Sequence, residues 1–234
     1  MAVASFSACK KDPAVVSTVV TVSYPTVTLN GADFIHIPVG GTFVDQGATL
    51  IDDITGASSQ VSATESELDV TTPGLYAVKY IAANANGFRT QATRGVLVLD
   101  YTPPVGLDPA FDISGDYLRA ATGVVAKLIR MDNGLYIFDH VGGSTAVPVY
   151  MLTPDTTSID VPLQTTYNGL SIECTNEVLT TNPPPITFRY KVAASGFGTS
   201  TRTFVKQYSI LHNEKGECQW YSPFSFYDCL VSFS

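Results

Sequence analysis

The sequence predicts an all-β protein with two domains, and three observations carry that prediction. Several segments alternate apolar and polar residues with a period of two, which is the spacing of a half-buried strand. The chain contains 18 glycines and 14 prolines, residue types that favour turns between strands. Hydrophobic residues make up 45% of the 234 residues, which is enough for folded cores, and this length allows one or two domains at about 100–200 residues each.

The first domain is expected over residues 24–101, after an amino-terminal segment of residues 1–23. Its strand candidates are residues 34–39, 75–82 and 95–99. In the second of these, Tyr76, Val78 and Tyr80 share one face of the strand. Short strands at this spacing predict a β-sandwich. The segment 102–112 begins Thr102-Pro103-Pro104, and this composition predicts a linker.

A second domain is expected over residues 113–206, again all β, as a sandwich or a barrel. Its best local signal is Asp132-Asn133-Gly134 between two apolar runs, which is typical of a hairpin turn. Further strand candidates are residues 124–130, 147–152, 169–174, 186–193 and 201–205. Residues 207–234 form an atypical tail without clear alternation. Two interpretations stay open for it, a late insertion or frameshift product and a true carboxy-terminal strand with an aromatic face.

Charge and hydropathy exclude several classes of function. The formal net charge is -8 and the isoelectric point is near 4.7, whereas a nucleic-acid-binding protein carries a basic face. The same acidity argues against electrostatic docking to an anionic lipid surface. No run approaches the roughly 18 apolar residues of a membrane-spanning helix. Neither a nucleic-acid partner nor a spanning segment is therefore expected.

The amino end changes abruptly from small and apolar residues to charged ones. Small and apolar residues end at Ser7-Ala8-Cys9, and Lys10-Lys11-Asp12 follows directly. This pattern resembles the end of a bacterial lipoprotein signal peptide, and the Cys-Lys-Lys-Asp start resembles many Bacteroidota lipoproteins. The resemblance implies a lipid anchor on Cys9, with residues 1–23 forming a truncated signal and tether. It also implies a bacterial outer-membrane location, at the cell surface or the periplasmic face.

The other three cysteines give no metal site. No pair is spaced as CxxC, and no histidine stands at zinc-finger spacing, so no structural zinc is expected. Cys218 and Cys229 can bridge in an oxidising compartment or remain free thiols. The sequence leaves open the disulfide state of Cys174, Cys218 and Cys229.

Three ordered motifs in the first domain resemble bacterial surface Ig-like domains, the type found in pesticidal-crystal and adhesin repeats. They are residues 40–48 (GGTFVDQGA), residues 72–80 (TPGLYAVKY) and residues 94–98 (RGVLV). The residues themselves predict scaffold roles. Gly47 supplies a permissive backbone angle, Asp45 accepts backbone N–H bonds in a turn, and Tyr76 and Tyr80 bury their rings with the hydroxyls near polar partners.

The opening of the second domain, with residues 114–119 (SGDYLR) and then residues 132–136 (DNGLY), resembles the domain that follows an Ig-like domain in uncharacterised Bacteroidota lipoproteins. Those proteins are often encoded beside outer-membrane glycan-uptake systems. The resemblance implies a non-catalytic, lipid-anchored envelope protein that assists glycan capture or uptake, with a polysaccharide or an outer-membrane protein as partner. The alternative is a structural or adhesive module that binds a protein partner and has no affinity for sugars.

The sequence contains no motif for catalysis, so no catalytic residue, cofactor or metal is assigned and the ligand-binding residues stay unknown. The histidines lie in separate segments, and only His140, beside a glycine loop, is conceivable as a general base. A weaker alternative is calcium held by loop carboxylates, with candidates Asp33, Asp45, Asp52 and Asp53. Sugar rings stack on exposed aromatic faces, and the second domain offers Tyr117, Tyr136, Phe138, Tyr150, Tyr167 and Tyr190, most of them expected in the core.

Overall fold

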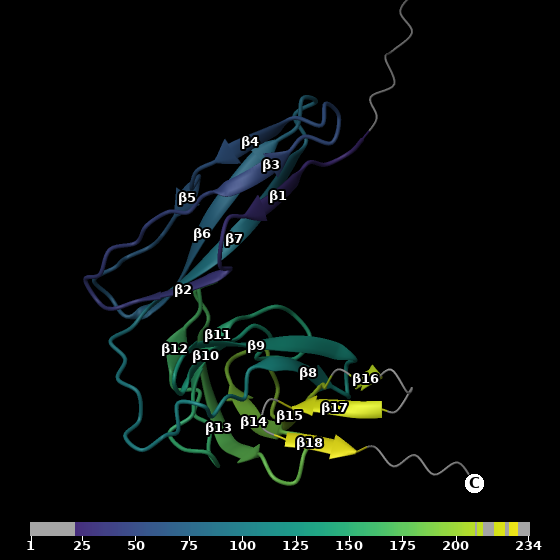
Figure 1. The fold of residues 1–234 in the computed structure, drawn as a ribbon. Coiled ribbons are helices and arrows are strands. Elements are labelled where there is room, and N and C mark those ends of the chain that lie inside the picture. Colours follow the sequence, from purple (N-terminus) through teal and green to yellow (C-terminus); the bar gives the residue numbers. More distant parts are fainter. Residues whose placement is uncertain (1–21, 209, 213–217, 223–224, 229–234) are drawn as a thin grey trace, which may run out of the picture.

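A computed structural model describes residues 22–208, 210–212, 218–222 and 225–228, and these residues form strands and turns without a helix. The chain divides visually into an elongated sandwich and a rounded, barrel-like sheet (Figure 1). Both parts are all β, as the alternation of the sequence predicts. None of the described residues forms a helix that is long and apolar enough to cross a membrane.

Two sheets make up the first part of the chain. One sheet has the order β1-β3-β4, with β1 (Thr26–Leu29), β3 (Ala48–Ile51) and β4 (Ser58–Val61). The other has the order β2-β7-β6-β5, with β2 (Phe34–Ile37), β7 (Arg89–Val98), β6 (Gly74–Ala83) and β5 (Glu65–Ser66). Strand β2 runs parallel to β7. The core between the sheets includes Val78 and Tyr80, on the face that the sequence predicts.

The second part is one eight-stranded antiparallel sheet with the order β11-β10-β9-β8-β15-β14-β13-β12. Its strands are β8 (Gly115–Arg119), β9 (Val124–Asp132), β10 (Leu135–Phe138), β11 (Val149–Leu152), β12 (Gln164–Thr165), β13 (Ser171–Thr180), β14 (Thr187–Ala193) and β15 (Arg202–Lys206). The predicted turn at Asp132-Asn133-Gly134 joins β9 to β10. Gly134 has a φ of 79°, which favours glycine.

The two ends of this sheet are drawn together into a nearly closed barrel. Leu152 at the end of β11 exchanges two backbone hydrogen bonds with Asp160, at 2.8 and 2.9 Å. The next residue, Val161, accepts the Cys174 N–H of β13 at 3.0 Å. Gln164 of β12 adds a side-chain link: its amide oxygen accepts the Tyr150 N–H at 2.8 Å and its amide nitrogen donates to the Tyr150 carbonyl at 2.9 Å. The Gln164 amide thus pairs with Tyr150 as a backbone peptide group would. We call this line of bonds, which joins β11 to Asp160, Val161 and Gln164, the seam of the barrel.

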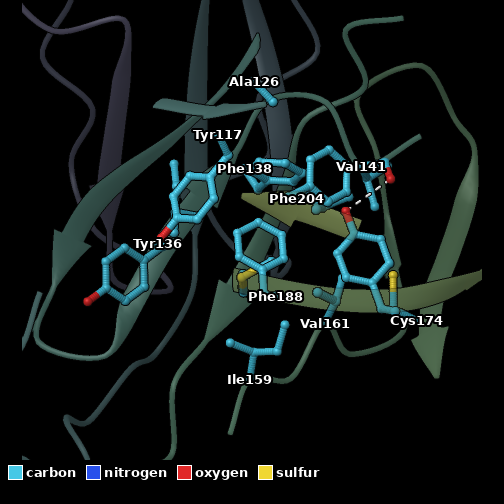
Figure 2. Packing of buried hydrophobic residues seen from close by; sticks show 14 of the residues in the cluster. Tyr117, Ala126, Tyr136, Phe138, Val141, Ile159, Val161, Cys174, Phe188 and Phe204 are labelled. Atoms are coloured by element: carbon cyan, nitrogen blue, oxygen red, sulfur yellow. Dashed lines mark hydrogen bonds between the residues drawn. The ribbon is translucent and has the colours of Figure 1, made fainter. Parts of the chain in front are cut away.

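Aromatic rings fill the barrel interior (Figure 2). The Phe188 ring lies at the centre, with its centroid 4.7 Å from that of Tyr117 and 5.2 Å from those of Phe138 and Phe204. All four side chains are completely buried. The interior of the barrel is therefore filled with side chains in the same way as an ordinary protein core.

A third apolar cluster joins the two parts of the chain. Leu75 of β6 and Leu97 of β7 pack with Leu135 and Ile137 of β10, and all four are almost completely buried. Because side chains alternate along a strand, β10 turns Tyr136 and Phe138 into the barrel and the other two toward the sandwich. Strand β10 is therefore buried on both faces.

The predicted linker lies against this junction. Directly before the linker, the Tyr101 hydroxyl donates to the Asn133 carbonyl at 2.8 Å, and within it the Leu107 carbonyl accepts the Asn133 side-chain amide at 3.2 Å. Leu107 itself is buried. The segment is thus held on the β9–β10 hairpin by side-chain bonds and apolar burial.

The predicted tail contains three short strands in a separate antiparallel sheet: β16 (Ile210–His212), β17 (Cys218–Ser222) and β18 (Ser225–Asp228). Before it, Gln207 donates its backbone N–H to Asp116 at 2.7 Å, and the Tyr208 hydroxyl accepts the Ile186 N–H at 3.2 Å. Bonding to the barrel therefore continues beyond Lys206. Cys229 lies outside the described residues.

Candidate functional site

The charged cluster inside the sandwich has a structural role. The Asp45 carboxylate accepts the Tyr80 hydroxyl at 2.6 Å and the backbone N–H groups of Gly47 and Ala63 at 2.9 and 3.0 Å. Arg94, completely buried, donates to the Tyr80 hydroxyl at 2.8 Å and lies 3.6 Å from Asp45. Burial, followed by the bond to Asp45, raises the pKa of Tyr80 to about 12. This network ties the loop before β3 to the opposite sheet.

Both scaffold predictions for this loop are confirmed. Gly47 has a φ of 70°, the left-handed region that glycine adopts without strain. Asp45 receives the turn N–H bonds that its position predicts. Tyr76 likewise places its hydroxyl against a polar partner, donating to the Thr72 carbonyl at 2.8 Å.

Three of the four carboxylates suggested for calcium, those of Asp45, Asp52 and Asp53, are engaged in local structure. Asp52 accepts backbone N–H groups of Ile54, Thr55 and Ala85 at 2.7–2.9 Å. Asp53 accepts the Asn84 amide at 3.0 Å. Within the part of the chain that the structure describes, no group of three or more His, Cys, Asp or Glu side chains could hold a metal ion. The geometry therefore gives no support to the calcium alternative.

The six candidate aromatics for sugar stacking are not surface platforms. Four of them, Tyr117, Tyr136, Phe138 and Tyr190, are completely buried in the barrel. The other two, Tyr150 and Tyr167, are half-buried and pack against the cluster between the two parts of the chain. Alternation along the strands explains the burial, as the sequence predicts for most of the set.

His140 is oriented by a neighbouring carboxylate. Its Nδ1 lies 2.7 Å from Asp139 Oδ1, and the same oxygen accepts the Lys127 N–H at 2.8 Å. General-base catalysis also needs a reacting proton within hydrogen-bond reach. Among the described residues, the imidazole of His140 forms a hydrogen bond only with Asp139. His36 instead forms a hydrogen bond between its Nε2 and the Leu99 carbonyl, at 2.9 Å. The two imidazoles are therefore bonded to different segments of the chain.

The glycine loop after His140 is held by polar side chains from other segments of the barrel. Three consecutive carbonyls, those of Val141, Gly142 and Gly143, all accept side-chain hydrogen bonds. Tyr190 donates to Val141 at 3.0 Å, as the dashed line in Figure 2 shows. Arg119 and Arg202 both donate to Gly142, at 2.9 and 3.1 Å. Thr122 also donates to the Gly143 carbonyl, at 2.6 Å. We call these three carbonyls and the side chains that donate to them the loop clamp.

The electrostatics of the loop clamp are unusual for an acidic protein. Arg202 is only 4% exposed. Burial lowers the pKa of Arg202, and the nearby Arg119 charge lowers it further. Within the described residues, neither arginine forms an ion pair with a carboxylate. By contrast, Arg94 and Arg130 each lie within 4 Å of an aspartate.

Sequence reasoning missed both arginines of the loop clamp. One signal could have identified Arg202: it precedes Phe204 by two residues, so strand alternation places both side chains on the inward face. A charged residue on such a face requires hydrogen-bonding partners. The partner loop lies some 60 residues earlier in the chain, and no local pattern predicts that pairing.

The comparisons with known proteins bear on the first part of the chain. Residues 27–98 match the family model of the Ig-like domain of bacterial surface proteins, which confirms the Ig-like domain that the motifs predict. A domain of this family indicates a location in the cell envelope. A solved structure, that of a lipoprotein from Bacteroides thetaiotaomicron, is similar at 25% identity and a TM-score of 0.40, covering 78% of this chain and 100% of that chain. Among curated proteins, nothing matches the chain.

Proposed function

We propose that the protein is a non-catalytic envelope protein, lipid-anchored through Cys9 to the bacterial outer membrane. The observation that carries this proposal is the match of residues 27–98 to a bacterial surface Ig-like domain. Cys9 and its motif lie outside the described residues. The first described residues enter the sandwich at its end remote from the barrel (Figure 1). An anchored chain would therefore hold its Ig-like domain between the membrane and the barrel.

The tether and the apolar junction support this arrangement. The 12 residues between Cys9 and Val22 can span up to about 40 Å when extended. Beyond them, the buried cluster of Leu75, Leu97, Leu135 and Ile137 couples the Ig-like domain to the barrel. Because the two domains are coupled, the barrel lies at a fixed distance from the Ig-like domain. This is the arrangement expected if the Ig-like domain is a spacer.

Acylation can be tested on Cys9→Ala. The unsubstituted chain should separate with the membrane fraction and carry acyl groups on Cys9 by mass spectrometry, whereas Cys9→Ala should become soluble. Cys174→Ala provides a matched control, because that thiol is buried in the barrel. Membrane association that persists in Cys9→Ala would disprove the anchor.

We further propose that the barrel assists glycan capture or uptake. The burial of its aromatic rings limits where a saccharide can bind. With the interior filled by rings, a saccharide would contact loops and outer surfaces of the barrel. A glycan array with soluble Cys9→Ala, run with and without calcium, tests this role. Binding to one class of polysaccharide would support it.

The second candidate is a structural or adhesive module with a protein partner. It is favoured by the burial or half-burial of all six candidate stacking aromatics. The absence of binding to host, plant and microbial glycans, together with a specific protein crosslink in intact cells, would support this candidate over glycan capture.

A further inference from the structure

Exposed apolar side chains gather at the end of the Ig-like sandwich that lies away from the barrel (Figure 1). Val22 and Tyr24 come just before β1, Ile51 is the last residue of β3, and Ile54 lies in the loop that follows. Their side chains are between 45% and 64% exposed. Because Thr26 pairs with Ile51, the start of β1 lies beside the end of β3. We call the side chains of Val22, Tyr24, Ile51 and Ile54 the apolar tip.

Side-chain contacts hold the segments that carry the apolar tip. The Asn84 amide, in the turn between β6 and β7, donates to the Ser23 carbonyl at 2.9 Å and to the Asp53 carboxylate at 3.0 Å. The Tyr24 ring packs edge-on against Phe88 of the same turn, with 5.6 Å between the ring centroids. Three segments that are distant in the sequence are therefore tied together, and the apolar side chains keep their positions at the surface.

The position of the apolar tip relative to Cys9 indicates what covers it. Single exposed apolar residues are common on protein surfaces, whereas a group of them at one site is typical of contact with a protein or a membrane. Val22 is separated from Cys9 by 12 residues, which span up to about 40 Å when extended. A lipid on Cys9 would therefore keep the apolar tip close to the bilayer, a step that rests on the proposed function.

We propose that the apolar tip inserts into the headgroup region of the phospholipid bilayer to which Cys9 is anchored. Tyrosine rings favour this region, and aliphatic side chains beside them reach the upper part of the acyl chains. The nearby carboxylates of Asp52 and Asp53 accept hydrogen bonds from the protein itself, so the contact is apolar and suits uncharged headgroups. Four side chains bind more weakly than an acyl chain, so Cys9→Ala still becomes soluble. The sandwich then holds the barrel at its end remote from the membrane (Figure 1).

The test measures vesicle binding by a full-length chain that carries one alkyl group on Cys9. Tetradecyl maleimide is coupled to the chain with Cys218→Ser and Cys229→Ser, and mass spectrometry confirms its position; Cys174 stays unmodified because it is buried. A single chain of this length gives only weak, reversible binding, with an association constant of about 10⁴ M⁻¹. Any further contribution from the apolar tip is then measurable by co-sedimentation with phosphatidylcholine vesicles.

The double variant Tyr24→Ser/Ile54→Ser should bind these vesicles about tenfold more weakly than the parent. A tenfold loss corresponds to about 55 Å² of apolar surface that no longer enters lipid. Val105→Ser/Leu163→Ser is the matched control, because both residues are apolar and at least as exposed but lie outside the apolar tip, and it should bind as the parent does. Equal binding by the parent and Tyr24→Ser/Ile54→Ser would overturn the proposal.

A second measurement does not depend on a variant that folds. A phosphatidylcholine with a diazirine near the headgroup end of its acyl chain should, on photolysis, label peptides that contain residues 22–24 and 51–54 of the alkylated parent. Peptides from the barrel loop at residues 194–200 should stay unlabelled, and the reverse pattern would overturn the proposal. Because the alkyl group is attached chemically, neither result depends on acylation of Cys9 in cells, which membrane fractionation of Cys9→Ala reports separately.

Discussion

Replacing Gln164 by Leu should open the seam of the barrel at little cost in volume. The Gln164 side chain is 7% exposed, and its amide makes three hydrogen bonds: two with the Tyr150 backbone, and one donated to the Pro162 carbonyl at 3.2 Å. Leucine fills similar space and makes none of them. At about 1 kcal/mol for each bond, the loss is about 3 kcal/mol. For a domain of 60–100 residues, the size range of the barrel, this lowers the melting temperature by about 12–24 °C.

The assay is thermal and urea unfolding followed by far-ultraviolet circular dichroism. Gln91→Leu is the control, because Gln91 is exposed on β7, and its effect should stay within about 0.5 kcal/mol. Gln164→Glu refines the test, since a carboxylate keeps the acceptor for the Tyr150 N–H but loses both donated bonds. If Gln164→Leu unfolds like Gln91→Leu, the seam is held by the backbone bonds at Asp160 and Val161, and the reasoning is wrong.

Three further predictions concern other parts of the chain. Leu97→Ala should cost about 2–5 kcal/mol in urea unfolding and expose the junction to limited proteolysis, whereas Leu163→Ala, at a residue 65% exposed, should change neither. Burial alone would raise the pKa of Asp45, but its hydrogen-bond donors and the Arg94 charge lower it overall. That stabilisation is present above the unfolded pKa, so the advantage over Asp45→Asn should shrink below about pH 4; an advantage independent of pH would contradict it. Burial raises the pKa of Cys174 to about 12, so in a chain whose other cysteines are serine, iodoacetamide at pH 8 should label it only after unfolding; rapid labelling of the folded chain would contradict this.

The strands that could be predicted are those whose two faces meet different environments. Strand β6 alternates because Tyr76, Val78 and Tyr80 face the sandwich core, and the sequence shows the pattern directly. The hairpin at Asp132-Asn133-Gly134 could also be predicted, because the residues that form the turn are adjacent in the sequence. Strand β4, by contrast, is Ser58-Ser59-Gln60-Val61. Its polar sequence gives no period, and pairing with β3 makes it a strand.

Features that depend on distant partners were not predictable. Nothing near Gln164 indicates that its amide completes a sheet, since the strand it belongs to is only two residues long. The junction of Leu97 with Ile137 joins segments 40 residues apart, and each looks locally like an ordinary core residue. Arg119 has the same difficulty, because its significance appears only when the Gly142 carbonyl and Arg202 are in place.

The burial pattern limits where this protein can meet a ligand. Aromatic rings occupy the barrel interior, and the Ig-like domain covers the outer face of β10 through Leu135 and Ile137. The loop clamp borders the barrel interior, because Val141 and Tyr190 belong to the barrel core, and it holds the loop after β10 that carries Gly142 and Gly143. It combines a backbone fixed by side-chain bonds with a buried Arg119 Nε that has no hydrogen-bond partner among the described residues. Stability alone does not call for an unpaired buried donor, because leaving one costs free energy. The bonds that Arg119 Nη1 donates to the Gly142 and Gly143 carbonyls offset that cost, so substitution of Arg119 should destabilise the glycine loop.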